Sequence, residues 1–395
     1  SEIFVIENSI TFNGNGKTLT STAGRAINVS GADGVTIKNL TINASGERAI
    51  NVIQNATNVT IENVTATAAN YTVNVAASAP NAVVAINYST LNGLCTVNVS
   101  AAGADVTIEG STVNCNDNNT TAGESYAALC LNKEAVDGSI VATNTTVNVT
   151  DGSDSTKGRN GAENGTVSIN GSTDDVTVMV AVITYEGSPY YYSFETLAAA
   201  VEYAKAGDVV TLIRDVTINE LVKIEEAVTL DLNGKTVTAN CKKAFEVYAN
   251  ATIKNGKIWS QQRCVDTRTN VVLTLADVTL EAPTYYSTHQ NQQPLTIGGS
   301  VDGTEIVMTN VNIDAGTTGY AIISFVQTNL TATNSNFSGY SALYVKEGSE
   351  ESEFKFEGST LEGNIGSNDV EGNSFATIAT EADDVTVTLD ANSKL

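Results

Sequence analysis

The chain has 395 residues and an apolar fraction of 42%, enough to fill the core of one long domain or two ordinary ones. Acidic residues outnumber basic ones by 44 to 20, so the formal net charge is −24. A field of this sign repels nucleic acids and anionic membrane surfaces, and no apolar run approaches the about 20 residues of a membrane span. The values exclude a disordered chain and argue against a nucleic-acid partner or a membrane span.

The residue usage is typical of short strands and tight turns. The sequence contains 31 Gly but only 4 Pro and 1 Trp, and it is rich in Asn, Thr and Val. The five cysteines are odd in number and form no C-x-x-C pair, which favours neither a disulfide framework nor a zinc site. We therefore expect all five to be small buried side chains: Cys95, Cys115, Cys130, Cys241 and Cys264.

The N-terminal residues, SEIFVIENSITF, have the pattern of a β-strand and not that of a signal peptide. We interpret the sequence as a mature or trimmed form whose export signal lies outside it. The expected location is secreted or at the cell surface.

A short block recurs along both halves of the chain, in the form apolar-x-apolar-x-(Asn/Gly/Asp)-x-x-apolar. The blocks begin at Val35, Val59, Val84, Val106, Ile140, Ala251, Leu273, Ile306, Leu330 and Phe354. Most lie 22 to 25 residues apart, and the longer gaps contain polar insertions. Alternation within each block predicts two short strands that face one core, with a bend between them.

The fifth position of each block is the predicted bend. Asn, Asp and Gly tolerate a positive φ best, and one of them occupies nine of these positions. The predicted bend residues are Asn39, Asn63, Gly110, Asn144, Asn255, Asp277, Asn310, Asn334 and Gly358. Tyr88 is the exception in its block, and we expect Asn87 beside it to take the bend in a shifted turn.

This pattern resembles the right-handed parallel β-helix of pectin-lyase-like proteins, and the resemblance covers nearly the whole chain. It implies an all-β solenoid in which each coil stacks on the previous one. With about 24 residues in a coil, we expect roughly sixteen coils.

One stretch breaks the repeat and predicts the only helix. Phe194, Leu197, Val201 and Ala204 share a helical face, so we expect a short amphipathic helix at about 194–205. Ser193 is the expected N-cap, and Gly207 the expected stop. The segment resembles the capping helix of bacterial secreted β-helix proteins, which covers the open core of the first coil.

The motif Asn-Gly-Lys-Thr occurs twice, at residues 15–18 and 233–236. We interpret each copy as part of the same early coil in two tandem modules. The predicted modules are 1–182, whose N-terminal cap is absent or outside the sequence, and 183–395, which begins with the capping helix.

Many relatives of this fold cleave acidic polysaccharides, with Arg or Lys as the base and calcium held by acidic side chains. The chain has one histidine and none of the surrounding hydrolase motifs, so the candidate catalytic residues are Arg263, Asp266 and Arg268. The plain alternative is a partly exposed Asp–Arg pair with no catalytic role. The sequence indicates no cofactor and no metal site, although calcium is compatible with the acidic composition.

The insertion at 282–295 favours binding instead. It gathers Tyr285, Tyr286, His289, Gln290 and Gln292, and aromatic faces beside amides suit sugar rings or peptide surfaces. The alternative is that the tyrosines cover apolar coil surface. Outward threonines alternate with Lys, Asn and Glu, which argues against a flat ice-binding array.

The sequence therefore predicts a non-catalytic, exported, monomeric surface protein, an elongated β-helix for adhesion or for binding a glycan or a protein. The alternative is a polysaccharide lyase or glycoside hydrolase that acts on an acidic polysaccharide.

Overall fold

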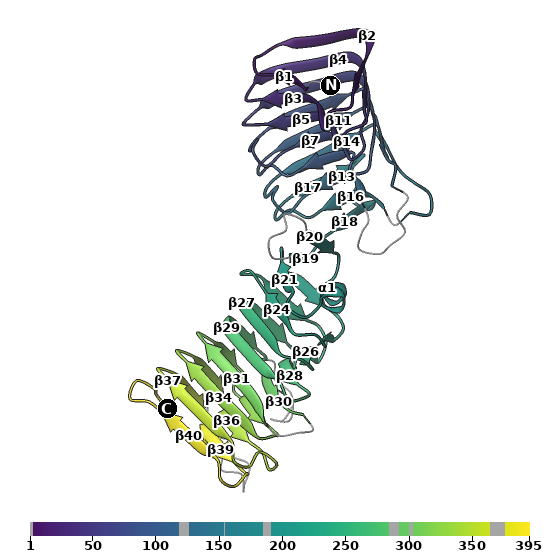
Figure 1. The fold of residues 1–395 in the computed structure, drawn as a ribbon. Coiled ribbons are helices and arrows are strands. Elements are labelled where there is room, and N and C mark those ends of the chain that lie inside the picture. The colour runs from purple at the N-terminus through teal and green to yellow at the C-terminus, as the bar shows by residue number, and fades with distance from the viewer. Residues whose placement is uncertain are drawn as a thin grey trace. The chain divides into compact units, whose positions relative to one another are not determined.

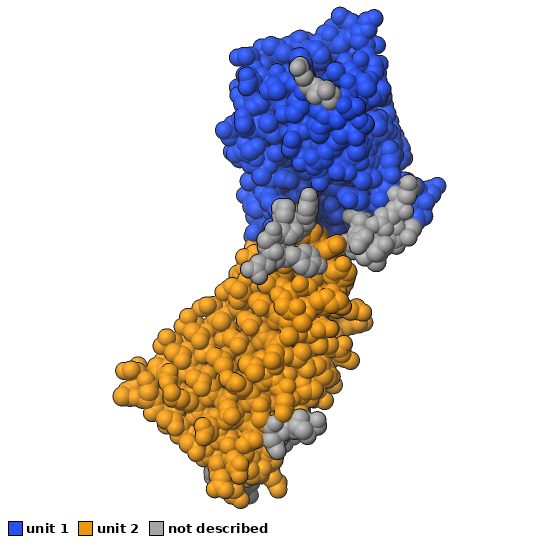
Figure 2. Space-filling view, viewed as in Figure 1, with its two compact units in different colours: residues 1–179 blue, residues 180–395 orange. Residues whose placement is uncertain are grey.

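A computed structural model describes residues 3–117, 126–153, 155–184, 191–283, 292–299, 303–363 and 376–395. The chain forms two compact units, unit 1 with residues 1–179 and unit 2 with residues 180–395 (Figures 1 and 2). Each unit is a parallel β-solenoid, which confirms the predicted all-β, right-handed β-helix class. The solenoid has about 14 turns rather than roughly sixteen, because the insertions and the segment before the second repeat take up residues without adding coils.

Unit 1 is built from two sheets whose strands follow one another up the stack. Sheet A contains eight strands: β1 (Phe4–Ile6), β3 (Arg25–Ser30), β5 (Arg48–Ile53), β7 (Tyr71–Val75), β10 (Val97–Val99), β13 (Ala127–Leu131), β16 (Thr156–Asn160) and β18 (Val176–Val178). Sheet B contains ten: β2 (Thr11–Ser21), β4 (Asp33–Ala44), β6 (Thr57–Thr67), β8 (Val83–Asn87), β9 (Thr90–Gly93), β11 (Asp105–Glu109), β12 (Thr112–Cys115), β14 (Ser139–Thr143), β15 (Thr146–Val149) and β17 (Thr166–Ile169).

Unit 2 repeats this arrangement. Sheet C contains fifteen strands: β19 (Ala181–Thr184), β20 (Tyr191–Phe194), β21 (Val209–Leu212), β22 (Val216–Ile218), β24 (Val228–Asp231), β25 (Thr236–Ala239), β27 (Ala251–Ser260), β29 (Val272–Glu281), β31 (Thr304–Thr309), β32 (Asn312–Asp314), β34 (Thr328–Thr333), β35 (Asn336–Gly339), β37 (Glu353–Glu357), β38 (Thr360–Gly363) and β40 (Thr386–Leu389). Sheet D contains seven: β23 (Val222–Ile224), β26 (Lys243–Val247), β28 (Arg263–Thr267), β30 (Leu295–Ile297), β33 (Tyr320–Ser324), β36 (Ser341–Val345) and β39 (Ile378–Thr380).

The core of each unit consists of apolar side chains stacked in register. In sheet A, Ile27, Ile50, Val73, Val97 and Leu129 are successive partners, and all five are buried. Parallel strands lie about 4.8 Å apart, so each of these side chains stacks on another of the set in a neighbouring coil, and the stack ends at Gly158, the next partner of Leu129. The apolar positions of the repeated blocks therefore form one continuous core in each unit, as the alternation predicted.

The bends have the backbone conformation that the repeat requires. All nine bend residues have positive φ, from 48° at Asn144 to 60° at Asn255. Several of the amides also bond from coil to coil, as Asn63 Nδ2 does to Asn39 Oδ1 at 2.8 Å. The expectation for the remaining block was wrong: Tyr88 itself takes the bend, with φ 50°. Its backbone is held in line with the other bends, since Tyr88 N donates to Glu109 O of the next coil.

The helix that precedes the second repeat is shorter than expected. Helix α1 covers Leu197–Tyr203 and buries Leu197, Ala200 and Val201 against the first coil of unit 2. Thr196, not Ser193, is the N-cap, because Ser193 belongs to β20 and Thr196 Oγ1 accepts a hydrogen bond from Ala199 N. No helix of the described residues is long and apolar enough to cross a membrane.

The cysteines are buried or partly buried, but two of them are also bonded to each other, although the sequence favoured no disulfide framework. Cys95 and Cys130 form a disulfide, and Arg159 Nη2 lies 3.7 Å and 3.2 Å from their sulfur atoms. An insertion separates the two cysteines by 35 residues, although they belong to neighbouring coils. Cys115 and Cys264 are buried thiols, and Cys241 is partly buried.

We expect the bend residues to contribute stability through both their backbone conformation and their amides. Asn310 has φ 54° and donates from Nδ2 to Asp277 Oδ1 at 2.9 Å. Asn310→Ala should lower the free energy of unfolding of unit 2 by about 1–2 kcal/mol, because alanine disfavours positive φ. Asn310→Gly should cost less, since it loses the side-chain bond but keeps the conformation. Denaturant unfolding followed by circular dichroism measures both, and equal losses would contradict the backbone argument.

Candidate functional site

Strands β26 and β28 pair near the start of unit 2 (Figure 1). Charged side chains gather on the outer face of sheet D at this pair of strands. The parallel register puts Lys243 beside Arg263 and Glu246 beside Asp266. Arg268 follows β28 directly, and Tyr248 follows β26. We call Lys243, Glu246, Arg263, Asp266 and Arg268 the charge cluster. It includes all three of the predicted catalytic candidates.

Asp266 is the centre of the charge cluster and is fully buried. Its Oδ2 atom lies 2.8 Å from Lys243 Nζ and 2.9 Å from Arg263 Nη1, and 3.8 Å from Arg268 Nη1. The Oδ1 atom is also buried and has no hydrogen-bond partner among the described residues. One carboxylate is thus surrounded by three cations, which is the pairing that a buried charge requires.

Glu246 neutralises part of this positive charge. Its Oε1 atom accepts from Lys243 Nζ at 2.7 Å, and its Oε2 atom accepts from the Tyr248 hydroxyl at 2.9 Å. Burial by itself would raise the pKa of Glu246, but the two hydrogen bonds and the charges of Lys243 and Arg268 lower it below its ordinary value. Glu246 is therefore a carboxylate and not a proton donor at neutral pH.

Arg268 is the most accessible member of the charge cluster, with 42% of its side chain exposed. It lies 3.9 Å from Glu246 Oε1 and 3.8 Å from Asp266 Oδ2, longer than a hydrogen bond. In the next coil the corresponding residue is Gly298, where a Cβ would lie 3.9 Å from Asp266 Oδ1. One coil further the backbone amide of Phe325, which is 39% exposed, bonds to Ile297 O.

The charge cluster carries an excess of positive charge on an acidic chain. Three cations stand against two carboxylates, so the formal sum is +1 where the whole chain has −24. The sum indicates local affinity for an anion. No group of three or more His, Cys, Asp or Glu side chains suited to a metal ion occurs in the described part of the chain.

The predicted binding insertion falls largely outside the described residues. Tyr285, Tyr286, His289 and Gln290 belong to 284–291, of which the structure describes nothing. Gln292 is described and fully buried, and its Oε1 atom accepts a short hydrogen bond from the Thr318 hydroxyl. A buried Gln292 packs inside unit 2 and has no surface open to a ligand.

Sequence reasoning missed Lys243, Glu246 and Tyr248. A signal was present, because Lys243-x-x-Glu246 is followed one coil later by Arg263-x-x-Asp266, a cation three residues before an acid in both cases. Equal positions in neighbouring coils stack in a solenoid. The two motifs could therefore have been placed side by side from the coil spacing.

Comparisons with known proteins found no match in sequence and a structural similarity of low score. No protein-family model matches the chain, and no curated protein matches it in sequence. Among solved structures, it aligns with a PL6 family alginate lyase, AlyGC, over 100% of this chain and 96% of that chain. The identity is 10% and the TM-score 0.32, so the similarity does not extend to a substrate or to catalytic residues.

Removing the central carboxylate should destabilise unit 2. Asp266→Ala removes the buried carboxylate that pairs with Lys243 and Arg263, and we expect a loss of about 2–3 kcal/mol in the free energy of unfolding. The control is Glu357→Ala, which breaks the exposed Lys355–Glu357 pair and should cost less than about 1 kcal/mol. Urea unfolding of both variants tests the difference. A loss at Asp266 no larger than the control would show that the cluster does not depend on this carboxylate.

The lowered pKa of Glu246 predicts a pH dependence of stability. A carboxyl whose folded pKa lies below its unfolded value of 4.5 stabilises the fold above that pH, and the contribution is lost as pH falls through the folded value. Glu246→Gln should therefore lower stability at pH 7 and flatten the decline below pH 4.5. Thermal unfolding at several pH values measures this, and parallel pH profiles for the two proteins would contradict the assignment.

Proposed function

We propose that the protein is a non-catalytic binding protein and that its charge cluster binds a saccharide that bears a carboxylate. One observation carries the proposal: Lys243 and Arg263 hold Asp266, while Arg268 remains half-exposed and beyond hydrogen-bond distance of both carboxylates. A guanidinium in this position can bind a carboxylate through two parallel hydrogen bonds.

The pairing of the charge cluster favours binding over catalysis. A general base must be able to accept a proton at the working pH. Lys243 lies 2.7 Å and 2.8 Å from two carboxylate oxygens, so both carboxylates of the cluster engage its ammonium group. Glu246 is held ionised by its hydrogen bonds, so it is not a proton donor. Lys243, Glu246, Arg263 and Asp266 are thus each engaged by another member of the cluster, and Arg268 alone has no hydrogen bond within it.

Aromatic side chains near Arg268 favour a sugar over a simple anion. By the strand register, Tyr248 precedes Arg268 by one coil and the exposed Phe325 follows it by two, and Lys223 Nζ lies 5.9 Å from the centre of the Tyr248 ring. Apolar faces of pyranose rings pack on such rings, while the carboxylate meets the cation. The field of the acidic chain repels long polyanions, so short acidic oligosaccharides are the favoured ligands. The proposal includes a location outside the cell, at a surface where such saccharides occur, and a monomer.

Loss of Arg268 should abolish most of this binding. We expect trigalacturonate, trimannuronate or triguluronate to bind the full chain, and Arg268→Ala to weaken that binding at least tenfold. Lys355→Ala is the charge-matched control, since Lys355 is an exposed cation on β37, outside the cluster. Isothermal titration calorimetry in the presence and in the absence of calcium measures the affinities. Equal losses in the two variants, or no binding of any probe, would refute the proposal.

The same samples test the alternative of a polysaccharide lyase. Lyases produce unsaturated sugars, which absorb in the ultraviolet. Turnover of polygalacturonate or alginate that Arg263→Ala or Asp266→Ala abolishes would replace a binding function by a catalytic one.

A further inference from the structure

Tyr88, at the bend between β8 and β9 of unit 1, departs from the repeat in two ways. The nine predicted bend residues are Asn, Asp or Gly, whereas Tyr88 is aromatic and still has φ 50°. Its side chain is 67% exposed, and among the large apolar side chains of the described residues only Leu395 is more exposed. A bulky residue in this conformation is strained, and such strain is concentrated at functional positions.

The ring of Tyr88 packs against the backbone of a glycine in the next coil. The bend residue of the next coil is Gly110, with φ 58°. A Cβ at Gly110 would lie 2.8 Å from both Cδ1 and Cε1 of Tyr88, closer than real contacts allow. The missing side chain lets the ring lie against the coil, and the rest of the ring remains in solvent. The result is an aromatic platform on the outer face of sheet B.

Two uncharged rows run beside this platform. One row consists of threonines in register over six coils: Thr18, Thr41, Thr65, Thr90, Thr112 and Thr146. The second row, two residues further along each strand, contains Thr20, Asn43, Thr67, Asn92, Asn114 and Asn148. Neighbouring coils lie about 4.8 Å apart, so hydroxyl and amide groups repeat at that spacing. The charged side chains that interrupt sheet B lie in other rows, which the sequence alone did not separate.

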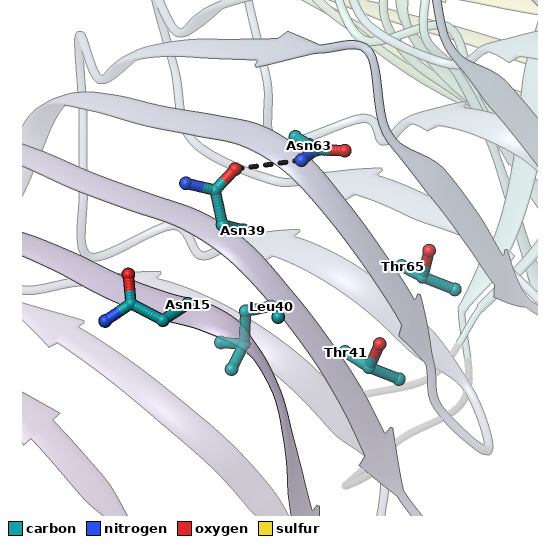
Figure 3. A pocket seen from close by; sticks show the side chains of 7 residues that line it. Asn15, Asn39, Leu40, Thr41, Asn63 and Thr65 are labelled. Carbon is teal, nitrogen blue, oxygen red and sulfur yellow. Dashed lines mark hydrogen bonds between the residues drawn. The ribbon is translucent and has the colours of Figure 1, made fainter.

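A hollow lies over the coils that precede Tyr88, on the opposite side from Gly110, and Tyr88 is not among the residues that line it. It has a volume of about 480 Å³ and lies over the first coils of unit 1 (Figure 3). Asn63 and Thr65 line its edge, and they belong to β6, which pairs with β8 and β9 on either side of Tyr88. Figure 3 shows Thr41 and Thr65 on adjacent strands with their side chains on the same side, next to the bonded amides of Asn39 and Asn63.

We propose that this face binds a neutral saccharide chain, with one pyranose ring stacked on Tyr88 and the following units over the hollow. The aromatic ring supplies an apolar face for the axial hydrogens of a sugar, and the Asn and Thr side chains supply donors and acceptors for its hydroxyls. The row next to the bend residues contains Lys38, Glu62, Asn87 and Glu109, and its two carboxylates flank Asn87 beside Tyr88, where they disfavour an acidic sugar. This site lies in the other unit from the charge cluster and does not depend on it.

The substitution Tyr88→Asn separates a binding role from a structural one. Asparagine is the commonest bend residue of this protein and tolerates positive φ. We expect Tyr88→Asn to keep or raise the melting temperature of unit 1 and to weaken binding of a neutral oligosaccharide at least tenfold. The probes are cellohexaose, xylohexaose, mannohexaose and laminarihexaose, titrated by calorimetry against the full chain.

Two further variants control the result. Val83→Asn removes another exposed apolar side chain, 45% exposed, at the start of β8, the strand that precedes Tyr88, and should leave binding unchanged. Gly110→Ala pushes against the ring and should lower both binding and melting temperature. Arg268→Ala, run in parallel, should leave neutral probes bound, which distinguishes this site from the charge cluster. No binding of any probe at millimolar concentration, or equal affinity in Tyr88→Asn, would overturn the inference. The inference would also be overturned if the unsubstituted protein and Tyr88→Asn both slowed ice recrystallisation and neither of them bound a saccharide.

Discussion

Backbone hydrogen bonds between one coil and the next are the interaction on which both units depend. Every strand pair among the described residues is parallel except the two pairs made by β19. Parallel register places equal positions of successive coils directly above one another. The register survives only if each coil bends at the same place, and this is why left-handed residues recur at the bends. Core, amide rows and surface rows all follow from that one constraint.

Stacking in register is favourable for apolar and amide side chains but unfavourable for like charges. The pairing of β26 with β28 brings Lys243 beside Arg263 and Glu246 beside Asp266. In each strand the acid lies three residues after the cation. Lys243 can therefore contact both Glu246 of its own coil and Asp266 of the next coil, which offsets the repulsion between the stacked like charges. The ion pairs of the charge cluster therefore relieve the repulsion between like charges that the register stacks. The cluster also carries excess positive charge, and its accessible side chain is that of Arg268.

The two units present different chemistry on the same scaffold. Sheet D of unit 2 carries buried ion pairs beneath one accessible guanidinium, whereas sheet B of unit 1 carries uncharged rows beside an aromatic platform. A solenoid permits this difference, since outward positions contribute little to the core and are open to substitution coil by coil. Function in such a fold is thus decided by rows of outward side chains rather than by the fold itself.

The sequence by itself determined the solenoid, its bend residues and the approximate place of the capping helix. These features are local periodicities, and a period of about 24 residues with Asn or Gly at one fixed position allows few other structures. The N-cap was missed, because Ser193 and Thr196 are both good caps and only the start of the first coil distinguishes them.

Only the tertiary structure decided which side chains meet across coils of unequal length. An insertion separates Cys95 from Cys130 in the sequence, so their pairing follows from the stack and not from the spacing. Tyr88 shows the same limit: its intrinsic preference is against positive φ, yet it takes φ 50° at the bend, where its backbone amide bonds to Glu109 O of the next coil. Pairing between coils is a long-range contact. Its free energy outweighs the conformational preference of a single residue, which is what a local sequence pattern reflects.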